Sequence, residues 1–128
     1  MHYYFSKTIE ASFEDAIGIA TEALKKEGFG VLTEIRIHDK LKEKINVDFH
    51  PYIILGACHP PSAYKALQKE NKIGTMLPCN VIVQQTGQNR MEIAAVDPVA
   101  SMQAIGNPEL ADVAMEVRAK LQRVIESI

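Results

Sequence analysis

Residues 52–83, YIILGACHPPSAYKALQKENKIGTMLPCNVIV, decide the fold that we predict for this chain. The stretch opens with a run that is apolar at both alternating sets of positions, which is typical of a strand covered on both faces. Pro60 favours extended geometry at His59, and the Pro60-Pro61 pair suits the first turn of a helix. A turn over 74–78 then precedes a second apolar strand. The stretch therefore predicts strand, helix, turn and strand, and we expect its first strand to be central in the sheet.

The remaining sequence adds elements on both sides of this stretch. Ser12 and Asp15 predict a capping box for a helix that Gly28 ends. The strand after Gly28 is expected to pair with the first strand as a hairpin-like neighbour; the alternative is a crossover made by the helix between them. Asp39 is the expected cap of a short helix with Asn46 at its exit. The elements expected are strand 2–10, helix 13–27, strand 29–37, short helix 40–44, strand 52–57, helix 60–71, strands 79–85 and 90–96, helical turn 99–105 and helix 110–128.

This order, β-α-β-(α)-β-α-β-β-α, predicts an α+β fold in which helices pack on a mainly antiparallel sheet. The chain has 128 residues, of which 47% are hydrophobic and 23% charged. That length suits one domain, 1–128, with a core large enough to need no metal or disulfide. The turn over 86–89 predicts a hairpin between the fourth and fifth strands.

Composition also narrows the classes of function. A net charge of −2 with interspersed signs gives no attraction for a polyanion, so nucleic-acid binding is disfavoured. No apolar run approaches the ~20 residues that span a bilayer, and the first residues lack the pattern of a secretory signal. We therefore expect no membrane partner and a cytoplasmic location, where Cys58 and Cys79 are reduced.

Several motifs together resemble the domain of unknown function 302 family: LGACHPP at 55–61, AYKAL at 63–67, LPCNV at 77–81 and AVDP at 95–98. The resemblance extends over nearly the whole chain. It implies a compact α+β domain, similar in outline to the TATA-binding-protein-like folds and usually a homodimer in bacteria or archaea. It implies no settled activity. His59 stands where that family more often has asparagine, so the resemblance supports no mechanism that requires a histidine there.

The unusual residues gather at the ends of predicted strands. Cys58 and Cys79 each end or begin a strand, so their side chains can meet across neighbouring strands if the register permits. Two interpretations stay open: a pair of small buried hydrophobic groups, or a reactive thiol pair or metal or haem contact. The candidate binding residues are Cys58, His59, Pro60, Cys79, Asn80 and Asp97.

Metal binding and catalysis each meet an objection from the sequence. Cys58, His59 and Cys79 are the candidate metal ligands, with His50 as a further one. A closed zinc site needs four ligands, and neighbouring residues of a strand point to opposite faces. Nucleophilic catalysis needs a base and a group that orients it, for which His59 and Asp97 are the candidates; Asp97 before a proline also suits a turn or helix cap.

We therefore expect a homodimeric small-ligand-binding or interaction module. Its pocket is expected between the loop at Cys58, His59 and Pro60 and the chain entering Cys79. The alternative is a thiol-dependent redox or metal- or haem-binding protein that uses Cys58, Cys79 and His59. Whether the protein is an enzyme, and which cofactor it uses, stay undecided by the sequence.

Overall fold

The computed structural model describes residues 2–128, and it confirms the predicted α+β class. Three short 3-10 turns, at residues 73–76, 103–105 and 108–110, complete the connections. The main elements are β1 (Tyr4–Glu10), α1 (Phe13–Lys26), β2 (Gly30–Arg36), α2 (Ile37–Ile45), β3 (Tyr52–Cys58), α3 (Pro60–Lys69), β4 (Cys79–Gly87), β5 (Arg90–Val96), α4 (Pro98–Met102) and α5 (Ala111–Glu126).

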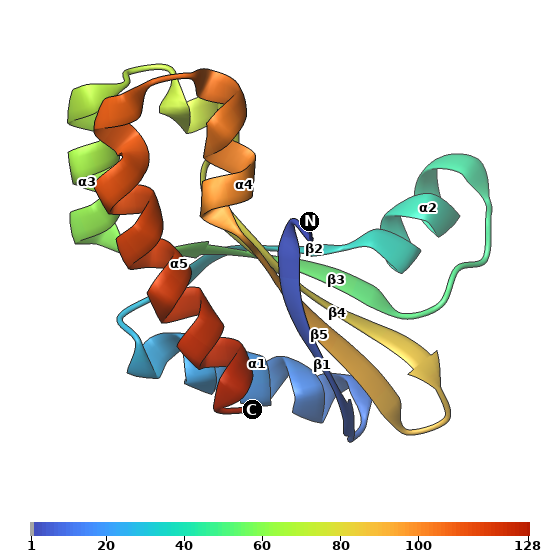
Figure 1. Ribbon diagram of the computed structural model, residues 1–128. Helices are drawn as coiled ribbons and strands as arrows, with labels where there is room; N and C mark the ends of the chain where they lie inside the picture. The colour runs from blue at the N-terminus through green and yellow to red at the C-terminus, as the bar shows by residue number, and fades with distance from the viewer. Residues whose placement is uncertain (1) are drawn as a thin grey trace.

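The five strands form one antiparallel sheet in the order β1-β5-β4-β3-β2 (Figure 1). The expected hairpin between β4 and β5 is confirmed. The expected hairpin-like pairing of the first two strands is wrong, because β1 and β2 are the two edges of the sheet. The alternative, a crossover made by the helix between them, is the arrangement that α1 forms. Helix α1 crosses the sheet, so that β1 pairs with β5 and β2 pairs with β3. The central strand is β4, while β3 is interior beside the edge strand β2.

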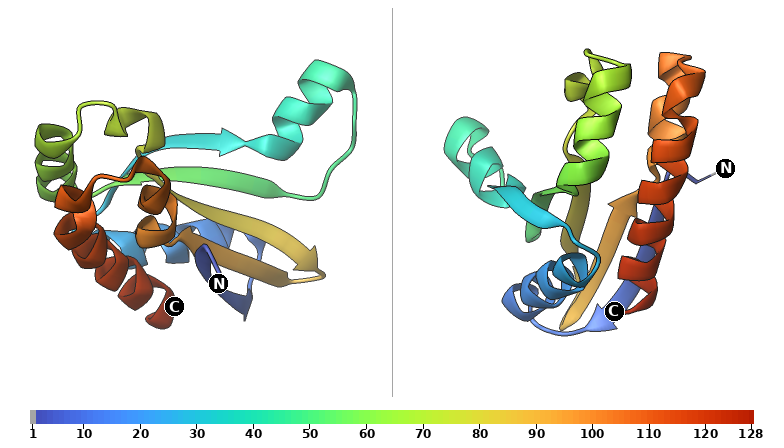
Figure 2. Two further views of the ribbon diagram at one scale, coloured as in Figure 1. Left: turned by 45° about the horizontal axis from the view of Figure 1, so that its top comes forward. Right: turned by 90° about the vertical axis from the view of Figure 1, so that its left-hand side faces the viewer.

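Helices α1 and α5 pack against one face of the sheet, and α3 packs against α5 beyond the strand ends (Figure 2). The predicted cap of α1 is confirmed, because the Asp15 amide donates to the Ser12 hydroxyl at 3.1 Å. Burial of the apolar stripes of α1 and α5 against the strands is the main source of stability. The fully buried centre includes Leu24, Ile53, Leu55, Val81, Val83, Ile93, Leu121 and Val124.

The second face of the sheet is open, which corrects the expectation that β3 is covered on both faces. On this strand Ile53 and Leu55 are fully buried under the helices, whereas Ile54 on the opposite face is only half-buried. The apolar side chains of β3 thus contribute to the core on one face of the sheet and to the open surface on the other. None of the helices within residues 2–128 is long and apolar enough to span a membrane.

Residues 37–51, which we call the arm, stand apart from the other helices (Figure 2). Helix α2 begins at Ile37, three positions before the predicted start, so Asp39 lies inside its first turn instead of capping it. Asn46 ends the helix in the left-handed conformation at φ 56°, as expected for this exit residue. No side chain of α2 is buried, so the arm makes little core of its own.

Candidate ligand-binding site

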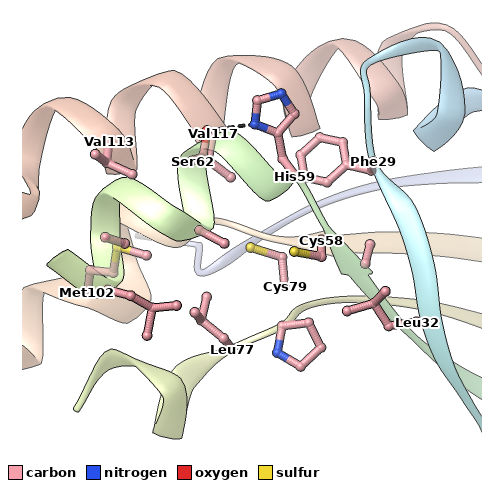
Figure 3. A pocket seen from close by; sticks show the side chains of 15 residues that line it. Phe29, Leu32, Cys58, His59, Ser62, Leu77, Cys79, Met102, Val113 and Val117 are labelled. Atoms are coloured by element: carbon pink, nitrogen blue, oxygen red, sulfur yellow. Dashed lines mark hydrogen bonds between the residues drawn. The ribbon is translucent and has the colours of Figure 1, made fainter. Parts of the chain in front are cut away.

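A cavity of about 280 Å³ lies where α3, α5 and the ends of β3 and β4 meet (Figure 3). A bulge in β2 between Val31 and Thr33 interrupts its alternation, and Leu32 of this bulge reaches the cavity wall. The wall is largely apolar, and its polar atoms come from a few side chains at the strand ends. The lining residues are Phe29, Leu32, Ala57, Cys58, His59, Ser62, Ala63, Ala66, Leu67, Leu77, Pro78, Cys79, Met102, Val113 and Val117.

The sheet register brings the two free thiols to this cavity. Cys79 pairs with Ala57 of β3, and Cys58 is the next residue along that strand. Burial raises the pKa of Cys79 to about 11, and the nearby Cys58 adds to the rise. Cys79 is therefore protonated near neutral pH, where it behaves as a small polarisable apolar group.

His59 is the N-cap residue of α3, and its ring reaches the same cavity. Its Nδ1 and the buried Ser62 hydroxyl share a hydrogen bond of 2.7 Å, one turn along the helix. The ring also lies 5.6 Å from that of Phe29, centre to centre. Burial lowers the pKa of His59, which favours a neutral imidazole that can pair with a polar ligand group.

Charges on two helices act on His59 in addition to burial. Lys120 of α5 lowers its pKa further, Glu116 opposes that effect, and Lys65 of α3 lowers it again. The lysines disfavour a second positive charge beside them. The surroundings of His59 therefore favour its neutral form over the imidazolium.

The geometry does not support the redox or metal interpretation. The chain turns into α3 at His59, so His59 reaches the cavity with both cysteines, despite the opposite-face objection. One nitrogen of His59 is already paired with Ser62, and the Cys79 thiol resists the deprotonation that a thiolate ligand or nucleophile requires. Within residues 2–128, no group of three or more His, Cys, Asp or Glu side chains is arranged to hold a metal ion.

The other three candidate residues lie away from this cavity's lining. Pro60 is the first residue of α3, where it fixes the helix start behind His59. Asn80 points to the open face, on the side of β4 opposite Cys79. Asp97 is buried, accepts from the Val99 amide at 3.0 Å as the N-cap of α4, and pairs with Arg118 at 3.1 Å. Asp97 is thus a helix cap and ion-pair partner, and it does not orient His59.

Two groups were not found from the sequence. Ser62 is buried at the third position of α3. It follows the N-cap residue His59 by three positions, and this spacing could have indicated a side-chain contact between the two. The second group lines a cavity of about 430 Å³ on the open face and includes Tyr52 and Glu92. There Gln84 donates to Glu92 at 2.8 Å and pairs with Nε2 of His50 at 2.8 Å. His50, a predicted metal-ligand candidate, thus belongs to this polar chain.

Comparison with known proteins agrees with this description. The family model described as "Domain of unknown function DUF302" matches residues 5–128. A crystal structure of an uncharacterised conserved DUF302 protein from Bacillus stearothermophilus superposes with a TM-score of 0.89. The two chains are 28% identical, and the match covers 98% of each. None of the curated proteins matches the chain. Because the family match spans almost the whole sequence, the chain belongs to the DUF302 family.

Proposed function

We propose that the protein is a small-ligand-binding domain whose ligand occupies the cavity between α3, α5 and the strand ends. The observation that carries this proposal is the convergence of a concave apolar wall with a few polar side chains, Cys58, His59 and Ser62, at one place. Ligand sites in proteins have this composition, in which apolar contacts supply affinity and a few polar groups set orientation.

The cavity favours a compact, neutral, mainly apolar ligand. A volume of about 280 Å³ is at the small end of ligand pockets, which start at roughly 300 Å³. Among the described residues, the wall has no carboxylate to pair with a cation, and a neutral His59 attracts no anion. The ligand should therefore carry one hydrogen-bonding group, which His59 can meet, on an apolar body.

Indole and benzene are suitable probes, and binding can be followed by amide and methyl NMR shifts. We expect both to move signals of Ala57, Ala63 and Val117, with indole binding more tightly because it adds an N–H. Ala63→Leu places extra side-chain volume in the cavity and should abolish the shifts. Ala119→Leu makes the same change at an exposed position of α5 and should leave them intact. Shifts that persist in Ala63→Leu, or that occur elsewhere, would refute this site.

We also propose that the protein forms a homodimer through the arm and the adjoining edge strand β2. Large apolar side chains are exposed along this continuous segment, and α2 buries none of its residues in its own chain. Such a concentration of exposed apolar side chains is typical of a surface that meets another protein, and an edge strand adds unpaired backbone groups. The exposed side chains are Leu32, Ile35, Ile45, Val47 and Phe49.

A second copy satisfies this surface symmetrically, because a two-fold axis places the same apolar segment on both sides of the interface. Sedimentation at micromolar concentration tests the proposal. Ile45→Lys together with Val47→Lys should yield monomers, whereas Ile19→Lys on α1, also an exposed isoleucine, should leave the dimer intact. A wild-type monomer would overturn this proposal without affecting the ligand cavity.

A further inference from the structure

The open face of the sheet holds a second cavity, of about 430 Å³, on the side away from α1 and α5. Its floor is formed by half-buried apolar side chains of β4 and β5, and its rim by three tyrosines and two amides. Glu92 is the only charged side chain among the described residues that line it.

Glu92 is held in a fixed position at this cavity. The side-chain amide of Gln84 donates to its Oε1 at 2.8 Å. Gln84 is held in turn by Nε2 of His50, which pairs with its carbonyl oxygen at 2.8 Å. This chain engages Oε1, which leaves the other carboxylate oxygen available to a ligand. A carboxylate positioned in advance binds a cation without the cost of ordering its side chain.

Three tyrosines line the same cavity as this carboxylate. Tyr52 of β3 pairs with Gln84 of the neighbouring strand β4. Burial, and then the charge of Glu92 and the neighbouring Tyr3, raise the pKa of the Tyr52 hydroxyl, so Tyr52 stays neutral beside the acid. The rings of Tyr3 and Tyr4 meet edge to face with their centres 5.1 Å apart. Aromatic faces attract cations, and they do so more strongly where water is partly excluded.

We propose that this cavity binds a small organic ammonium ion, with the cationic group at Glu92 and its alkyl body against the tyrosine rings and the apolar floor. A metal ion is a poorer match, because hard cations require several oxygen ligands and the cavity supplies a single carboxylate. A neutral ligand is also a poorer match, because it would bury Glu92 without a partner for its charge.

Choline chloride is the probe, and 3,3-dimethyl-1-butanol, which has the same shape without the charge, is its control. Binding is followed by two-dimensional amide NMR of the full chain. We expect choline to shift the amides of Tyr52, Gln84 and Glu92, and the neutral alcohol to bind about tenfold more weakly, as the loss of one charged contact implies. Equal binding of the two compounds, or choline shifts outside this cavity, would overturn the proposal.

Variants separate a charge effect from a folding effect. Glu92→Gln keeps an oxygen that can accept from Gln84, and it should weaken choline binding about tenfold while the spectrum stays folded. Glu22→Gln removes one negative charge from the exposed surface of α1 and should leave choline binding unchanged. Unchanged binding in Glu92→Gln would refute the site. Indole binding in the α3–α5 cavity is read from different signals, so either proposal can fail alone.

Discussion

Thr33 of β2 lies so close over Gly56 of β3 that a methyl group at residue 56 would overlap the threonine hydroxyl. The two residues pair across the antiparallel strands just after the β2 bulge. Pro78, at the entry to β4, closes the same space, since its Cγ would lie 2.8 Å from the added methyl group. Because Gly56 has no side chain, β2 can lie close to β3 and to the start of β4, where these strands border the ligand cavity.

Gly56→Ala should therefore destabilise the protein by about 1–3 kcal/mol, since both the Thr33 side chain and the rigid Pro78 ring would have to move. Gly18→Ala on α1 is the matched control, because nothing lies within 4 Å of its added methyl group. In a helix this control should gain up to roughly 1 kcal/mol. Urea unfolding measures both. Equal stability of Gly56→Ala and wild type would contradict the steric argument.

The ion pair of Asp97 with Arg118, in which the carboxylate is buried and the arginine is half-exposed, should contribute more to stability than a pair with an exposed carboxylate. Asp97→Asn retains a capping oxygen for the Val99 amide but removes the charge that faces Arg118, so we expect a loss of about 1–3 kcal/mol. Glu14→Gln breaks the exposed pair with Arg36 and should cost no more than about 1 kcal/mol. Chemical denaturation compares the two. A smaller effect at Asp97 than at Glu14 would mean that burial of the carboxylate does not strengthen the pair.

Cys79 should resist alkylation in the folded protein. With its pKa raised to about 11, few molecules carry a thiolate at pH 8, and iodoacetamide reacts with the thiolate. In a Cys58→Ser variant, which keeps the burial that is the larger cause of the raised pKa, mass spectrometry should show slow labelling of Cys79 that accelerates as the pH rises above 8. The same variant unfolded in urea is the control and should label at the rate of a free thiol. Equal rates in the two states would mean that Cys79 is an accessible, ordinary thiol.

The sequence predicted the elements well because their signals are local. The Ser12 cap, the helical stripe of α5 and the turn between β4 and β5 each act within a few residues. Strand order is not local: the alternation after Gly28 predicts a strand but cannot choose between β1 and β3 as its partner. The error over β2 follows from that ambiguity.

The site could be predicted only in part, for the same reason. Cys58, His59 and Cys79 are near one another because two strand ends and the start of a helix lie at the same place. The Pro60-Pro61 pair predicts that helix start from the sequence. Asp97 was grouped with them by its residue type, whereas its partner Arg118 lies on α5. The Glu92 cavity depends on the register of β3, β4 and β5, which no single segment encodes.

His59 offers a pH test of the α3–α5 cavity. Its pKa is lowered from the ordinary 6.5, first by burial and then by Lys120, with Glu116 opposing. The unfolded chain therefore binds the proton more readily than the folded one. This histidine's contribution to stability is full above pH 6.5, declines as the pH falls through 6.5 toward the folded pKa, and is constant below it.

Proton NMR of the His59 ring should accordingly give a titration midpoint below 6.5. Lys120→Met removes a repelling charge and should raise this midpoint, whereas Glu116→Gln removes an attracting one and should lower it further. Because burial is the larger cause, Lys120→Met should not restore the ordinary value. A midpoint that neither substitution moves would mean that the helix charges do not reach the ring. A midpoint above 6.5 would mean that the cavity accommodates a charged imidazole, and the neutral ligand proposed for it would then be the wrong class.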